Sequence, residues 1–392
     1  MSFLETFLER VAILQKKHAI AVLIIILVAT LFIGYGITKI QMESDINKEM
    51  PQELPIYKLN NKITDTFGGQ DTTILLLTLD DSIDYKDAPK DIRDPSIINY
   101  LKILQVELEK ESMIEGVTSI ATYTSNIDFK NLNQVQTFLK AAPALGSFFS
   151  KDYKTTIMFV TADVGSSDEK VHALSKLIND KIDGLSIPSG LKIMQTGTPQ
   201  LRITIFSLLA SDAMFTLVLA AAIILLLLFI MERSFTKGLL VFSPLMFGLI
   251  WTMGTMGWLG IKLSIATVGL GAMILGLGVE YGTFILTRYK EERDKEKNQL
   301  DSLKVAVPGV GSAILGSGAT TIIGFLALTL SVMPMLQHLG VSLALGIFYS
   351  LFAAVFVSPI IIILEEQFEY YYTHRKHEKI LSKKEKHMRN EL

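Results

Sequence analysis

Residues 19–37 read AIAVLIIILVATLFIGYGI, an apolar run without a charged side chain that follows the basic triplet KKH at 16–18. The hydrocarbon core of a membrane is about 30 Å thick, and about 20 apolar helical residues cross it. A secretory signal peptide would have a shorter core and a small-residue cleavage site. We therefore expect a retained anchor, transmembrane helix 1, over residues 19–37.

Five further apolar segments are long enough to cross a membrane. They predict transmembrane helices 2 to 6 at about 206–230, 238–260, 264–286, 311–333 and 341–364. Six spans explain the composition, because 49% of the 392 residues are hydrophobic and only 19% are charged, whereas soluble domains carry about 25% charged residues. The net charge of −2 gives no basic character for nucleic acid binding. The absence of cysteine excludes a disulfide scaffold, a thiolate metal site and a cysteine nucleophile.

The segment between the first two spans, residues 38–204, has a different character. It contains 18 Lys and Arg, 23 Asp and Glu and no long apolar run, for a net charge of −5. It is therefore predicted to be a soluble domain inserted into a membrane protein. The resulting layout is one span, a large loop and then, over residues 205–364, five spans with short connections.

Two strand–helix–strand patterns are visible in this inserted segment. Strands are predicted at 72–79, 117–121, 155–162 and 191–195, together with helices capped by Ser96 and Asp168 and a helical insert over 131–149. Split β-α-β units pack as one antiparallel sheet with helices on one face. The expected fold class is thus an α-helical membrane protein with six transmembrane helices (1 + 5) and an α+β, ferredoxin-like domain between helices 1 and 2.

Basic residues gather on one side of this topology. Residues 1–18 hold three, the loop after span two holds two, the loop after span four holds six and the tail 365–392 holds seven, whereas the short loops of the other side hold Lys262 alone. The positive-inside rule then places both termini in the cytoplasm and residues 38–204 outside the cell membrane. Apolar residues recur at helical spacing in residues 1–18, which is typical of an amphipathic segment at the membrane surface.

Two acidic residues lie inside predicted spans, Glu280 in span four and Asp212 in span two. A charge at mid-span costs about 2.5–3.5 kcal/mol on insertion scales, so such residues face protein or water and are candidates for function. A carboxyl group removed from water binds a proton more readily than one at a surface. Tyr281 adds a hydroxyl directly after Glu280. The alternative for Glu280 is a neutral, hydrogen-bonded side chain that only ties helices together. For Asp212, nearness to water at the outer end of its span is an equal alternative.

Small and hydroxyl-bearing residues predict the surroundings of the span-four acid. Gly276, Gly278 and Gly282 allow a neighbouring helix to approach closely, and Thr320 and Thr321 in span five are candidate hydroxyl partners. The dense glycines do not indicate a dinucleotide site, because that fingerprint requires a preceding strand and a soluble βαβ unit. The sequence shows no metal-ligating or nucleophile constellation, so it predicts neither an enzyme nor a cofactor.

The segment GLGVEYGTFILTRYKEER (276–293) resembles the G-x-G-x-D-Y-x-x-x-x-x-x-R-Y-R-E-E segment of the resistance-nodulation-division superfamily. The similarity is greatest to its MMPL, or hydrophobe-amphiphile efflux-3, branch, which overlaps the sterol-sensing-domain fold. It covers essentially the whole chain. It includes TGTPQLRI (196–203), SPLMFGLIWTMGTMGWLGIKLSIAT (243–267), GATTIIGFLAL (318–328) and HLGVSLALGIFYSLFAAVFVSPIII (338–362).

This resemblance implies proton-driven export of lipids or amphiphiles through an extracytoplasmic porter domain. The mid-membrane Asp-Tyr pair of the family carries protons, and it maps to Glu280 and Tyr281 here. Glutamate replaces the family's aspartate, which keeps the carboxyl group but moves it outward by one methylene. Proton coupling through Glu280 is the expectation that follows.

Members of the family commonly have two six-span repeats in one chain, whereas this sequence has one and is similar to single-repeat, half-size members. The resemblance therefore implies a homodimer in which Glu280 of both copies faces a shared axis. The expected function is proton-motive-force-driven export, with protons and a membrane lipid or amphiphile as partners. The alternatives are a non-transporting sterol-sensing-domain-like lipid sensor or scaffold, and an accessory of protein translocation.

Overall fold

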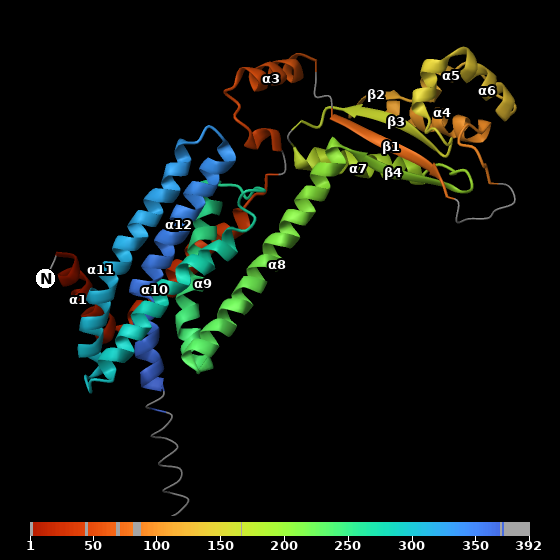
Figure 1. The fold of residues 1–392 in the computed structure, drawn as a ribbon. Coiled ribbons are helices and arrows are strands. Elements are labelled where there is room, and N and C mark those ends of the chain that lie inside the picture. The colour runs from red at the N-terminus through yellow and green to blue at the C-terminus, as the bar shows by residue number, and fades with distance from the viewer. Residues whose placement is uncertain are drawn as a thin grey trace, which may run out of the picture. The chain divides into compact units, whose positions relative to one another are not determined.

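The computed structural model describes residues 3–43, 46–67, 71–80, 88–165, 167–368 and 371. Contacts between Cα atoms divide the chain into two compact units. We call residues 44–208 the inserted domain, and residues 1–43 together with 209–392 the helical unit. Figure 1 shows the sheet of the inserted domain and the bundle of the helical unit.

Among the described residues, six helices are long and apolar enough to cross a membrane. Three are α2 (Ala19–Gly34) with the 3-10 turn η1 (Tyr35–Lys39), α8 (Thr198–Glu232) and α9 (Phe235–Leu259). The others are α10 (Leu270–Arg293), α11 (Gln299–Leu326) with η4 (Ala327–Leu330), and α12 (Pro334–Phe356), which continues as a candidate span to Phe368. A shorter amphipathic helix, α1 (Phe3–Lys17), precedes them. The chain is therefore a multi-pass membrane protein.

Helix α10 is shifted along the sequence relative to the predicted span at 264–286. The residues before it form a turn in which the Ser264 amide donates to the Thr267 hydroxyl at 2.8 Å. Leu263 pairs with Met42, which follows η1 in the chain. At its other end α10 continues to Arg293, because the lysines, arginines and glutamates of this segment favour helix.

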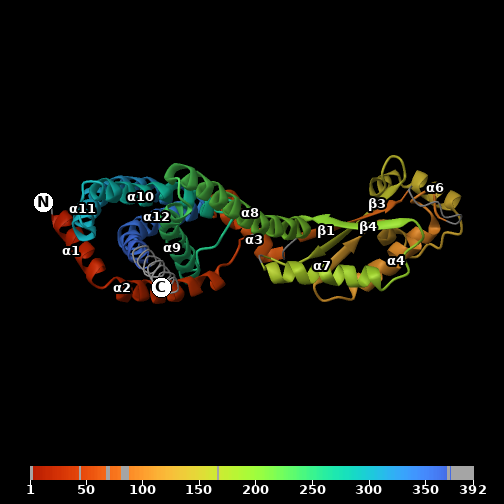
Figure 2. The ribbon, with the colours of Figure 1, turned by 90° about the horizontal axis from the view of Figure 1, so that it is seen from below.

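Helices α9 and α12 form the centre of the helical unit, between α2 on one side and α10 on the other (Figure 2). In the most apolar windows of α9, α10 and α12, 61%, 50% and 67% of the residues are buried. The corresponding fractions for α2, α8 and α11 are 11%, 6% and 11%. The first three helices therefore make the core, and the other three offer most of their surface to lipid or to another chain.

Glycines allow α9 to approach the segment at the end of α2. A Cβ atom built on Gly254 would lie 2.1 Å from the backbone oxygen of Ile33, and one on Gly257 would lie 1.8 Å from the oxygen of Gly36. Nearby, the ammonium of Lys39 lies 3.7 Å from the ring centroid of Trp258, within the range of a cation–π interaction. No larger residue fits at the two α9 positions without moving the backbone.

The inserted domain contains a four-stranded antiparallel sheet with the order β2-β3-β1-β4. Its strands are β1 (Asp71–Leu79), β2 (Ile114–Thr118), β3 (Thr155–Ala162) and β4 (Leu191–Gly197). Helix α4 (Pro95–Glu109) connects β1 to β2, and α7 (Asp168–Asp183) connects β3 to β4. Alternate residues of the two central strands are buried in one apolar core with side chains of both helices.

Two predicted helix caps in this domain are wrong by one or two residues. The cap of α4 is Asp94 rather than Ser96, because the Asp94 carboxylate accepts a hydrogen bond from the Ser96 amide at 2.9 Å. The cap of α7 is Ser167 rather than Asp168, because the Ser167 hydroxyl accepts from the Lys170 amide at 3.3 Å. In each case the residue just before the apolar periodicity offers the oxygen that the first turn requires.

Two further elements end earlier than predicted. The second strand stops at Thr118 and not at residue 121, because Ser119 caps a short helix, α5 (Ile120–Thr124), through a capping box. The predicted helical insert at 131–149 is divided by Pro143 into α6 (Leu132–Ala141) and the 3-10 helix η3 (Pro143–Phe148). The short helix η2 (Ile46–Glu49) and helix α3 (Pro55–Phe67) precede the sheet.

Candidate functional site

Helix α10 holds the two residues that the sequence predicts as a proton relay. Glu280 and Tyr281 lie near the middle of Leu270–Arg293, and consecutive residues of an α-helix point about 100° apart. Tyr281 is only 2% exposed and belongs to the apolar core of the helical unit. Glu280 is exposed on the outer side of the helix. The pair is therefore divided between the core and an open surface.

The exposed face around Glu280 is apolar. Met273, Leu277 and Phe284 are 44%, 39% and 51% exposed, and with Glu280 they recur every three or four residues, which places them on one side of the helix. Within the described part of the chain the Glu280 carboxyl makes no hydrogen bond or ion pair. It is thus an unpartnered acid in the middle of a hydrophobic stripe.

Of the three glycines predicted to pack near the relay, two lie in close helix contacts. A Cβ atom on Gly278 would be 2.9 Å from the Ser350 hydroxyl oxygen of α12, and one on Gly282 would be 3.2 Å from the backbone oxygen of Val241 in α9. Gly276 lies on the exposed side of α10, where a Cβ atom would meet nothing within 4 Å among the described residues. Gly278 and Gly282 therefore allow the inner face of α10 to pack closely against α12 and α9. Gly276 leaves the outer face beside Glu280 without a side chain at that position.

The other candidate partners do not contact Glu280 in this chain. The hydroxyls of Thr320 and Thr321 both donate to the backbone oxygen of Ser317 on their own helix, at 2.6 and 3.1 Å. Asp212 is exposed on α8, and its backbone oxygen accepts from the Thr216 hydroxyl at 2.7 Å. The sequence could not show that these hydroxyls bond within their own helix, because back-bonding of Thr to a carbonyl of the preceding turn depends on the side-chain rotamer.

A pocket of about 500 Å³ lies between α10 and α11, starting one helical turn beyond Glu280. Helix α10 contributes Phe284, Thr287, Arg288 and Glu291, and α11 contributes Gly309, Val310, Ala313, Ile314 and Ser317. One end carries charged groups and the remainder is apolar or hydroxyl-bearing. This pocket was not predicted from the sequence, although the spacing of four residues between Gly309, Ala313 and Ser317 indicates an open small-residue face on α11.

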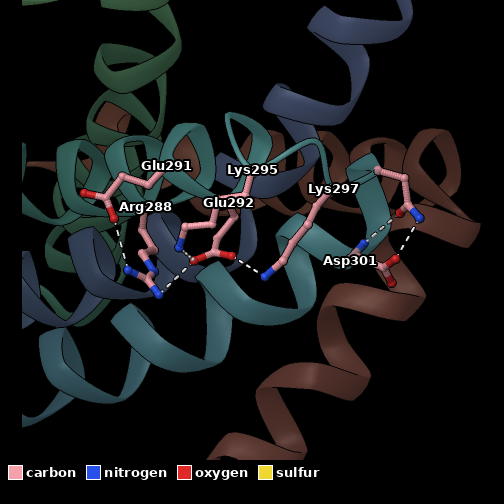
Figure 3. A network of polar contacts seen from close by, with 7 residues as sticks. Arg288, Glu291, Glu292, Lys295, Lys297 and Asp301 are labelled. Atoms are coloured by element: carbon pink, nitrogen blue, oxygen red, sulfur yellow. Dashed lines mark hydrogen bonds and ion pairs between the residues drawn. The ribbon is translucent and has the colours of Figure 1, made fainter.

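The C-terminal end of α10 is held by ion pairs around Glu292 (Figure 3). This carboxylate is 1% exposed, and it lies 2.9 Å from the guanidinium of Arg288 and 2.9 Å from the ammonium of Lys295. Lys297 is its third cationic partner. Arg293 pairs at 2.8 Å with Glu366, which follows α12. The network fixes the end of α10 to the connection that leads into α11, and Arg288 belongs both to the network and to the pocket lining.

The described residues include no group of three or more His, Asp or Glu that could hold a metal ion. Six helices long enough to cross a membrane, an inserted sheet domain and a mid-span carboxylate without a partner among the described residues define a multi-pass membrane protein. Comparison with protein families identifies it further, since residues 88–384 match the MMPL family. The chain belongs to the MMPL family.

Individual relatives agree with this assignment. A protein of Methanocaldococcus jannaschii, known by name only as a membrane protein, is 32% identical over 373 residues, covering 93% of this chain and 95% of the relative. The siderophore exporter MmpL5 of Mycobacterium tuberculosis is 26% identical over 209 residues, covering 52% of this chain and 21% of the exporter. The apo-petrobactin exporter of Bacillus anthracis is 24% identical over 274 residues, covering 60% and 36%. The chain thus spans nearly the whole archaeal relative but well under half of either exporter.

Proposed function

We propose that the protein is a proton-motive-force-driven exporter of lipids or other amphiphilic molecules, and that it works as a homodimer. Membership of the MMPL family and similarity to two named exporters support membrane transport. The observation that carries proton coupling is the Glu280 carboxyl, which lies mid-helix, exposed and without a partner among the residues that the structure describes. An acid in that position needs either a proton or a neighbour from outside the chain.

The second copy supplies that neighbour in our proposal. The apolar stripe of α10 around Glu280 adjoins the exposed small-residue face of α11 through the pocket between the two helices. Small residues allow membrane helices to approach closely, so this combined face suits a symmetric contact. Two carboxylates brought together at a two-fold axis repel each other when both are ionised, and protonation of one relieves the repulsion. Proton binding at Glu280 would then change how the two copies pack, with Tyr281 holding the inner side of α10.

The inserted domain completes this proposal. Its strand order and its two strand–helix–strand connections support our assignment of a ferredoxin-like, porter-like domain outside the cell membrane. The concentration of Lys and Arg in the remaining short loops and tail supports cytoplasmic termini. In this arrangement, residues 38–204 handle the cargo while the six spans take up protons.

Glu280→Gln tests the proton coupling in the full protein reconstituted into vesicles with an imposed pH gradient. We expect proton flux and gradient-driven lipid movement to fall to the level of empty vesicles, because glutamine has the shape of the acid but cannot exchange a proton. Glu296→Gln is the matched control, since it removes an exposed acid just beyond the same helix and outside the pocket and should retain flux.

Intact proton flux and transport in Glu280→Gln would remove the relay from the proposal. A protein that retains a bound lipid but moves none under any gradient would instead be a lipid sensor or scaffold. Lipid analysis of the purified protein distinguishes these results, because a sensor holds a defined lipid in stoichiometric amount.

A further inference from the structure

Helix α1 forms one wall of a groove on the helical unit. The groove has a volume of about 360 Å³, and every side chain that lines it is apolar. Leu4 and Phe7 come from α1, Leu315 and Ala319 from α11, and Phe348 and Phe352 from α12. Figures 1 and 2 both show α1 beside α11 at one side of the bundle. A hydrocarbon chain fits such a lining, whereas a polar ligand would find no hydrogen-bond partner in it.

The wall is anchored and not a loose terminus. Leu8 is 1% exposed and lies against Gly311 of α11, where a Cβ atom would be 3.0 Å from the leucine methyl. The buried side chain of Gln15 donates to the backbone oxygen of Phe356 at 3.1 Å. The groove therefore keeps its three-helix lining without depending on any other chain.

A basic residue lies about one helical turn from Phe7 of the groove lining. Phe3, Phe7, Arg10, Leu14 and Lys17 recur at three- and four-residue spacing and are all exposed, so one face of α1 combines apolar side chains with two cations. Arg10 follows Phe7 by about one turn, and neither Arg10 nor Lys17 has a hydrogen bond or ion pair among the described residues. The two acids of α1, Glu5 and Glu9, lie on another flank of the helix.

From this juxtaposition we infer that α1, α11 and α12 form a binding site for an anionic phospholipid, whose hydrocarbon chain lies in the groove and whose phosphate pairs with Arg10. A basic residue at a membrane surface attracts anionic headgroups, and an amphipathic helix adds buried apolar area to that attraction. The site is separate from the Glu280 face, because it uses the opposite flank of α11 from Gly309, Ala313 and Ser317. It does not depend on the proposed transport.

Two single variants and native mass spectrometry of the delipidated full-length protein test this site. The probes are phosphatidylglycerol and phosphatidylcholine with identical chains. We expect wild type to retain the anionic lipid preferentially, and Arg10→Gln to reduce that preference about fivefold, as the loss of one surface cation implies. Ala319→Trp fills the groove and should reduce retention of both lipids. Lys237→Gln and Ala222→Trp are the controls, because both replace exposed residues away from the groove and should behave as wild type.

Equal retention of the two lipids by wild type would overturn the inference. So would variants that cannot be distinguished from their controls. If Ala319→Trp fails to fold, a phosphatidylglycerol carrying a photoreactive group in its chain replaces it. Crosslinks on α1 and on residues 315–322 or 348–356 support the site, and crosslinks elsewhere alone contradict it.

Discussion

Asp91 and Arg93 form a two-point ion pair in the inserted domain. The Arg93 side chain donates to both carboxylate oxygens of Asp91, at 2.9 and 2.6 Å, and its guanidinium lies 3.4 Å from the ring centroid of Tyr153. Partial burial alone would raise the pKa of Asp91, but the hydrogen bonds and charge of Arg93 outweigh it, and the pKa is lowered.

A lowered pKa in the folded state has a predictable consequence for acid stability. The stabilisation is complete above the unfolded pKa of about 3.9, and it is lost as the pH falls through the lower folded value. Arg93→Gln should therefore destabilise the domain at neutral pH and leave it with a smaller loss of stability between about pH 5 and pH 3. Urea unfolding at several pH values, read from a fluorophore on Asn126→Cys, measures this. Lys140→Gln is the control and should keep the pH dependence of wild type. A pH dependence as small as that of Arg93→Gln in this control would refute the assignment.

The identity of the candidate residues could be predicted from sequence, but their surroundings could not. A carboxylate in an apolar span is conspicuous by its energetic cost alone, which singles out Glu280. Whether Glu280 faces the core or the outside depends on which side of α10 packs against α9 and α12. That choice rests on Gly278 and Gly282 fitting against Ser350 and Val241, contacts between segments far apart in the chain.

At the scale of elements, the crossing of α9 with the end of α2 depends on two glycines. In Gly254→Ala or Gly257→Ala, the new methyl group would lie about 2 Å from a backbone oxygen, so the backbones must separate. Overpacking costs typically about 1–3 kcal/mol, and we expect a lower thermal midpoint together with a changed fluorescence of Trp258. Gly324→Ala is the control, because a Cβ atom there has no neighbour within 4 Å among the described residues. A midpoint unchanged in all three variants would show that the close approach is absent in solution.

The end of α10 provides a second prediction at this scale. Glu292→Gln leaves Arg288, Lys295 and Lys297 facing one another without their shared anion. Like charges then repel, and the connection from α10 to α11 should open more often. Trypsin cleavage after residues 293–297 should accelerate, whereas Glu291→Gln, which loses one pair with Arg288, should be cleaved nearly as slowly as wild type. Equal cleavage of the two variants would mean that the network does not restrain this connection.

Apolar length predicted the number of membrane-crossing helices, because a span has to satisfy the bilayer thickness whatever its neighbours are. It did not predict where α10 begins, since the turn at Ser264 and the pairing of Leu263 with Met42 depend on contacts outside the run. The groove beside α1 could not be predicted from the sequence either. The apolar periodicity of residues 1–18 fits a helix on the membrane surface as well as a helix packed on α11.

At the scale of the whole molecule, the sequence predicts one six-span unit, and the structure leaves its α10–α11 face uncovered. A homodimer that closes this face is isologous, so residues near its axis meet their own copies. Since the chain has no cysteine, Leu277→Cys introduces a unique thiol on that face, one turn from Glu280. We expect mild oxidation in membranes to give a disulfide-linked dimer, because a disulfide needs Cα atoms about 4.4–6.8 Å apart. Ile24→Cys, at a position that is also exposed but lies on α2, should stay monomeric. Dimers from Ile24→Cys but not from Leu277→Cys would place the contact on the α2 side, and Glu280 would then need a proton partner other than its own copy.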